Sequence, residues 1–186
     1  MTASFLVSTL VVSLAEIGDK TQLLSLMLAA RFRRPVPIVI GILVATLLNH
    51  ALAAWLGQWA GEQLQGALGR WIVGLSMIAM ALWTLKPDKL DDTDVPPNRY
   101  GLLALTFVLF FVAEIGDKTQ VATVLLAAEY QSLIGVVAGT TLGMMIANVP
   151  AVLLGARFAN RMPLKNIRTV TAGVFFVLGV LALAGI

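Results

Sequence analysis

Two identical seven-residue segments, Glu-Ile-Gly-Asp-Lys-Thr-Gln, occupy residues 16–22 and 114–120. Each copy places two carboxylates three residues apart and follows them with a lysine and two neutral oxygen-bearing side chains. Carboxylate oxygens are the hard ligands that calcium, magnesium and manganese ions prefer. Because the chain contains no cysteine, thiolate metal sites are excluded. The repeated acids therefore predict a cation site built from oxygen ligands.

The acids lie in a strongly apolar chain. Of 186 residues, 59% are hydrophobic and only 12% are charged, and the mean hydropathy is +0.89. Six apolar stretches follow one another, at residues 3–30, 36–60, 68–85, 102–128, 133–158 and 170–184. Each approaches or exceeds the roughly 20 residues that a helix needs to cross the hydrocarbon core. We predict an all-α polytopic membrane protein with six transmembrane helices, the first of which is retained and is not a secretory signal.

Glu16 and Glu114 each lie near the middle of an apolar stretch. About thirteen helical residues precede each of them, which corresponds to roughly 20 Å of helix. A charged residue at that depth costs about 2.5 to 3.5 kcal/mol, so function is the default explanation for it. Ion pairs that merely hold helices together would need one acid per lysine, whereas each copy carries two acids. An ion pathway is therefore the favoured interpretation.

The two copies belong to a longer internal repeat. At the same offset of 98 residues, Gly41 matches Gly139 and His50 matches Asn148. We assign residues 1–86 and 101–186 to two three-helix repeats and residues 87–100 to an acidic cytoplasmic linker. Because three is odd, the second unit must run upside down. Inverted repeats are typical of secondary transporters, whose site lies near the midplane between the halves.

On continuous helices the acids and lysine of each copy would share one stripe, so antiparallel packing would gather four carboxylates. The four carboxylates and the two lysines together carry a net charge of minus two, which a divalent cation balances. The predicted ligands are Glu16, Asp19, Glu114 and Asp117, and the supporting residues are Gly18, Lys20, Thr21, Gln22, Gly116, Lys118, Thr119 and Gln120. The threonines and glutamines can coordinate only if the helix unwinds at the glycines; otherwise they form interhelical hydrogen bonds. His50, Asn49 and Asn148 either reach the site or join helices. Gly135, Gly139 and Gly143, spaced by four, predict a close-packing surface.

Basic residues gather in three loops on one side of the predicted bundle: Arg31, Arg33 and Arg34, then Lys86, Lys89 and Arg99, then Arg157, Arg161, Lys165 and Arg168. By the positive-inside rule that side is cytoplasmic, and both termini lie outside the cytoplasm. These residues are interpreted as topology signals, so no nucleic-acid partner is predicted.

The two copies of Glu-x-Gly-Asp-Lys-Thr, in a chain of two three-helix units, resemble the Gdt-type family of cation/proton antiporters. That family includes Golgi manganese and calcium transporters and bacterial manganese exporters. The resemblance implies that the motif acids bind Mn²⁺ or Ca²⁺, with Mn²⁺ preferred, and that the metal leaves the cytoplasm in exchange for protons. It also implies an inner-membrane location, a bilayer and a divalent cation as partners, and no resident cofactor. A homo-oligomer is left open.

Two other functions are compatible with the acids. Asp19 and Asp117 could activate water as an intramembrane aspartyl hydrolase does, but each is followed by a lysine that keeps it ionised, whereas that chemistry needs a shared proton. A non-transporting membrane assembly factor is the other alternative. We expect a transporter and not an enzyme.

Overall fold

A computed structural model describes residues 1–64, 66–87, 101–154 and 164–185. Its helices are α1 (Thr2–Glu16), α2 (Lys20–Phe32), α3 (Pro35–Gln63), α4 (Ala67–Thr84), α5 (Leu102–Glu114), α6 (Lys118–Tyr130), α7 (Leu133–Leu154) and α9 (Leu164–Ala184). The prediction of an all-α fold is confirmed for these ranges. Most of the predicted linker and the loop residues Arg157 and Arg161 lie outside them.

Four of the described helices, α3, α4, α7 and α9, are each long and apolar enough to cross a membrane. Helices α1 and α2 pass the same test only together, as one span bent by 67°. The prediction of six transmembrane helices is therefore not confirmed, and the apolar stretches at residues 3–30 and 102–128 each form two helices separated by a break. The inverted orientation of the halves stays a prediction.

The first break is a type II turn encoded by the motif itself. Ile17 has φ −65° and ψ 114°, and Gly18 has φ +83°. The Asp19 N–H donates to the Glu16 carbonyl at 3.0 Å, which closes the turn. A type II turn needs a positive φ at its third residue, and glycine adopts that conformation without strain.

The second copy of the motif makes the same turn. Ile115 has φ −62° and ψ 119°, Gly116 has φ +73°, and the Asp117 N–H donates to the Glu114 carbonyl at 3.1 Å. In both copies the glutamate ends one helix and the aspartate is the N-cap of the next. The predicted helical stripe of glutamate, aspartate and lysine is therefore wrong, because the backbone between them is not helical.

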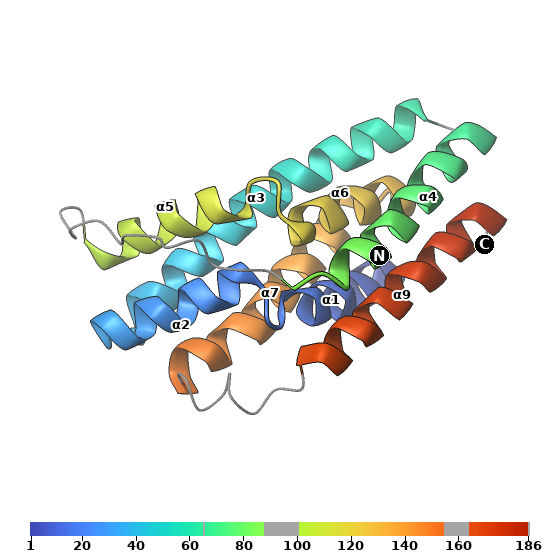
Figure 1. Cartoon of the computed structure of the whole chain (residues 1–186). Coiled ribbons are helices and arrows are strands. Elements are labelled where there is room, and N and C mark those ends of the chain that lie inside the picture. The colour runs from blue at the N-terminus through green and yellow to red at the C-terminus, as the bar shows by residue number, and fades with distance from the viewer. Residues whose placement is uncertain (65, 88–100, 155–163, 186) are drawn as a thin grey trace.

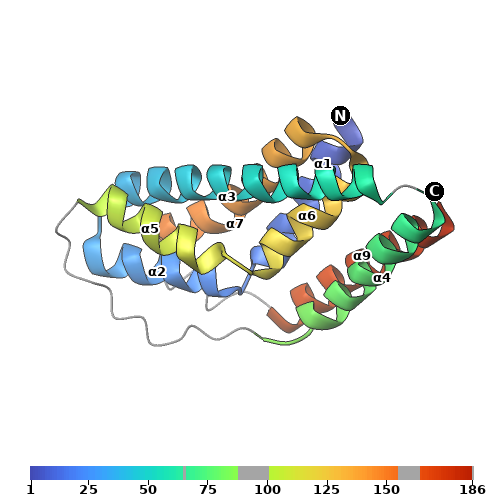
Figure 2. The ribbon, with the colours of Figure 1, turned by 90° about the horizontal axis from the view of Figure 1, so that it is seen from above.

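The helices of the two halves pack against one another. Helix α7 lies along α1, α3 lies along α5 and α6, and α4 pairs with α9 (Figures 1 and 2). A Cβ atom on Gly139 would lie 2.5 Å from the Phe5 carbonyl oxygen, and one on Gly143 would lie 2.7 Å from that of Thr9. The predicted close-packing glycines are thus confirmed. The long third helix of each half packs against the first helix of the other, which brings each motif beside the opposite half.

The outside of the bundle is apolar. Trp55 is 63% exposed, and Leu75 and Phe176 are each more than half exposed. The buried positions include many hydroxyls, amides and acids, so the interior is the more polar region around the motifs. This arrangement suits lipid surroundings, since a water-soluble protein rarely exposes so large an apolar surface.

Candidate functional site

The four predicted acidic ligands are all buried. Glu16 and Glu114 have no exposed surface, and Asp19 and Asp117 expose 1% and 3%. They lie at chain breaks, where the last turn of one helix meets the first turn of the next. Such breaks leave backbone N–H and C=O groups unpaired by the helices, which is how broken helices of transporters contribute to ion sites.

Glu16 is held by donors from both halves of the chain. Its Oε1 accepts hydrogen bonds from the Thr21 hydroxyl of its own motif and from Asn148 Nδ2 of α7 at 2.9 Å. Its Oε2 has no hydrogen-bond partner within the part of the chain that the structure describes. One oxygen therefore fixes the carboxylate in place while the other is left for a ligand.

Glu114 has different neighbours. His50 of α3 occupies the position equivalent to Asn148, and its Nε2 lies 3.7 Å from Glu114 Oε2. Thr119, the equivalent of Thr21, is fully buried, but its hydroxyl has no hydrogen-bond partner among the described residues. Glu114 is thus held less tightly than Glu16, although the two motifs have the same sequence.

The motif glutamines hold the turns to the opposite half. Gln22 Oε1 accepts from the Gly18 N–H at 2.8 Å, and its Nε2 donates to the Ala147 carbonyl at 3.0 Å. In the second copy Gln120 Oε1 accepts from the Gly116 N–H at 2.7 Å, and its Nε2 donates to Asn49 Oδ1 at 3.2 Å. Of the two roles left open by the sequence, both glutamines take interhelical hydrogen bonding in this structure.

The lysines connect the two motifs to each other and to α4. Lys20 Nζ lies 3.5 Å from Asp117 Oδ1, so the lysine of the first copy pairs with an acid of the second. Lys118, only 3% exposed, donates from Nζ to the Lys86 carbonyl at 3.1 Å, just beyond the end of α4. Glu16 also interacts electrostatically with Asp117 and Lys20, and Glu114 interacts with Glu16. The motifs therefore form one electrostatic cluster.

The predicted cage of four carboxylates is not assembled in this conformation. Across residues 1–64, 66–87, 101–154 and 164–185, no three histidine or acidic side chains are arranged to hold a metal ion. Glu16 is engaged by Thr21 and Asn148, Asp19 Oδ1 accepts from the Lys20 N–H at 2.7 Å, and Asp117 is paired with Lys20. The assignment of the four acids as ligands stays a prediction.

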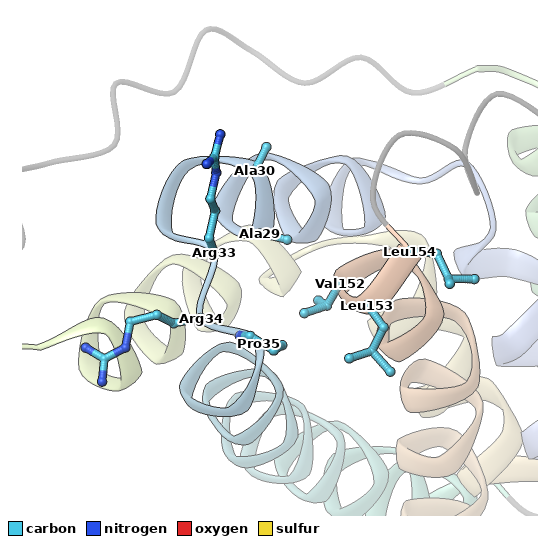
Figure 3. Close-up of a pocket in the computed structure, with 8 residues that line it drawn as sticks. All are labelled: Ala29, Ala30, Arg33, Arg34, Pro35, Val152, Leu153 and Leu154. Atoms are coloured by element: carbon cyan, nitrogen blue, oxygen red, sulfur yellow. The ribbon is translucent and has the colours of Figure 1, made fainter.

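Two surface hollows contain no acid. One of about 300 Å³ lies between the α2–α3 turn and the end of α7 and is lined by Ala29, Ala30, Arg33, Arg34, Pro35, Val152, Leu153 and Leu154. Figure 3 shows the side chains of Arg33 and Arg34 extending away from the leucines. The other, of about 290 Å³, is lined by Leu85, Pro87, Lys165, Arg168 and Thr169. Neither lining suits a cation, since each contains arginine and neither contains a carboxylate.

Sequence reasoning found most of the polar residues at the site but not their partners. The repeat offset pairs His50 with Asn148, and this is the signal that both face a glutamate. The contact of Leu164 with the first turn was not anticipated: a Cβ on Gly18 would lie 2.8 Å from Leu164 Cδ2. No local pattern marks that leucine, because the contact depends on where α9 begins.

Comparison with known proteins identifies the family of this chain. The family described as "Divalent cation/proton antiporter GDT1" matches residues 4–92 and 102–185. A Vibrio cholerae protein named "Putative manganese exporter" is 53% identical over 92% of this chain and 86% of its own length. GDT1-like proteins of Synechocystis and Arabidopsis thaliana are each 28% identical, over 98% and 89% of this chain and 97% and 88% of their own. No solved structure matches the chain. The chain belongs to the GDT1 family of divalent cation/proton antiporters.

Proposed function

We propose that this protein exports Mn²⁺ from the cytoplasm across the inner membrane in exchange for protons, with both termini outside the cytoplasm. The observation that carries the proposal is the contact between the motifs: Lys20 of one copy lies 3.5 Å from Asp117 of the other. Two acidic turns from opposite halves thus share one buried cluster. The relative named as a manganese exporter supports the choice of metal.

Lys20 occupies a position from which a cation would displace it. The Lys20 ammonium places a positive charge beside Asp117, where a divalent cation would also be stabilised. Lys20 is 31% exposed, so its side chain is not locked in that position. Metal entry would then free Asp117 and use the unpartnered Oε2 of Glu16. Because the same carboxylate oxygens bind either protons or the metal, the two occupants exclude each other and exchange results.

The two turns also differ in access. The Gly18 turn is covered by Leu164 at the start of α9, whereas nothing described lies within 4 Å of a Cβ built on Gly116. In a transporter of inverted repeats, rocking of one unit against the other exposes a fixed site to alternate sides. During that motion the Gly18 turn would become uncovered and the Gly116 turn would become covered.

Export of Ca²⁺ is the second candidate, since calcium also accepts an all-oxygen site. The hydrolase alternative is less compatible with the contacts, because Asp117 pairs with Lys20, whereas two catalytic aspartates must face each other and share a proton. The chain is therefore proposed to be a transporter and not an enzyme.

Transport is tested in proteoliposomes that contain the purified chain, a fluorescent Mn²⁺ indicator and an imposed pH gradient. We expect Mn²⁺ flux that follows the proton gradient in the wild type and falls at least tenfold in Glu16→Gln and in Asp117→Asn. Thr140→Val is the matched control, because the hydrogen bonds that the described residues give this buried α7 hydroxyl run to Val136 and Val137 of its own helix. Full flux in either motif variant would refute the site, and flux independent of the pH gradient would refute proton exchange.

A further inference from the structure

The most unusual buried group at the site is the imidazole of His50. It is the only histidine in the chain and has no exposed surface. Neither Nδ1 nor Nε2 has a hydrogen-bond partner among the described residues. Buried polar groups are almost always paired, because removal from water without a new partner is unfavourable. An unpaired imidazole in the interior therefore needs a functional explanation.

His50 lies beside Glu114, one of the four predicted acidic ligands. Its Nε2 faces Glu114 Oε2 at 3.7 Å, too far for a hydrogen bond but close enough for both atoms to contact one ion. The repeat gives an internal comparison, because Asn148 at the equivalent position donates to Glu16 at 2.9 Å. The asparagine thus donates a hydrogen bond to its glutamate, whereas the histidine at the equivalent position makes none with the described residues.

We propose that His50 is a further ligand of the transported cation and that its imidazole selects Mn²⁺ against Ca²⁺. The inference rests on the proposed function and names the selectivity element of that site. Calcium and magnesium take oxygen ligands, whereas imidazole nitrogen is a ligand for divalent transition metals. A neutral nitrogen beside Glu114 therefore favours a transition metal over an alkaline-earth ion of the same charge. Glu16, with an amide and a hydroxyl as neighbours, offers no such discrimination.

The single histidine makes a direct test possible. The full chain is purified without a histidine tag, loaded with Mn²⁺ and measured by electron spin echo envelope modulation. We expect nitrogen modulation at the Mn²⁺ that changes when only histidine is labelled with ¹⁵N and that disappears in His50→Asn. Bound Mn²⁺ whose spectrum does not respond to ¹⁵N-histidine would overturn the ligand assignment.

Selectivity gives the second readout. His50→Asn introduces the residue found at the equivalent repeat position, so the fold should tolerate it. Removal of an outer-shell partner of a metal ligand lowers metal affinity roughly tenfold, and loss of a ligand should lower the apparent Mn²⁺ affinity at least as much. The inhibition of Mn²⁺ flux by Ca²⁺ should change less than about threefold. An unchanged ratio of Mn²⁺ to Ca²⁺ affinity in His50→Asn, with Thr140→Val as control, would overturn the selectivity role. Wild-type protein that neither binds nor moves Mn²⁺ would instead overturn the proposed function, and the ligand assignment with it.

Discussion

The two motifs have the same seven residues and the same backbone turn, yet their side chains have different surroundings. In the first copy Thr21 and Asn148 both donate to Glu16, and Leu164 covers the Gly18 turn. In the second copy Thr119 has no described partner, and no described residue outside the turn lies within 4 Å of a Cβ built on Gly116. The local sequence therefore determines the turn, and the opposite half of the chain determines how tightly the turn is held.

This difference suits a transporter, since a site that exchanges ions needs one well-fixed ligand and one that can rearrange. Strained or weakly held groups are stabilised by the structure around them and persist mainly at functional sites. Matched substitutions at equivalent positions of the two copies measure the difference directly, because the substituted residue and its backbone conformation are the same in both.

The largest loss of stability is expected for Gly18→Ala, which is compared with Gly116→Ala. Alanine at a positive φ costs about 1 to 2 kcal/mol at either turn. At Gly18 the new methyl group would also lie 2.8 Å from Leu164 Cδ2, and such overpacking adds about 1 kcal/mol. Gly18→Ala should therefore lower the free energy of unfolding more than Gly116→Ala, measured by SDS titration in mixed micelles. Equal losses would show that Leu164 does not hold the first turn, and Gly18→Ala together with Leu164→Ala should remove the excess.

A smaller loss of stability is expected for Thr21→Val, which is compared with Thr119→Val. Valine keeps the shape of threonine but cannot donate to Glu16, and a hydrogen bond to a carboxylate contributes about 1.5 to 3 kcal/mol. Asn148 still donates to the same Glu16 oxygen, so the loss for Thr21→Val should lie near the lower value. Thr119→Val removes a hydroxyl without a described partner and should change stability by less than about 0.5 kcal/mol. Similar losses in the two variants would contradict the conclusion that Glu16 is held more tightly than Glu114.

Much of the site could be predicted from the sequence, because the repeat and the cost of charge in lipid are visible in it. The offset pairs Glu16 with Glu114 and His50 with Asn148, and all four are buried. The helix breaks were missed as definite features, since one glycine in an apolar helix costs only about 1 kcal/mol and is common. The signal was present: an aspartate N-cap followed three residues later by a glutamine is a helix start.

The partners of the charged residues could not be predicted in the same way. Lys20 was expected to share a helical stripe with Glu16, but it pairs with Asp117 of the other half. That choice depends on how α1, α2, α5 and α6 meet at the two turns, which no local pattern encodes. The contact of Leu164 with Gly18 has the same origin, since it depends on the packing of α9.

The smallest expected effect concerns the ion pair that joins the two motifs. In a double-mutant cycle of Lys20→Met and Asp117→Asn, the coupling energy should be about 0.5 to 1 kcal/mol, because the Lys20 side chain is 31% exposed and loses conformational entropy when it pairs with Asp117. A second cycle, with Lys20→Met and Asp19→Asn, measures the coupling of Lys20 to the aspartate of its own copy. A coupling to Asp19 larger than that to Asp117 would place Lys20 within its own motif, and the two turns would then no longer share a cluster through this lysine.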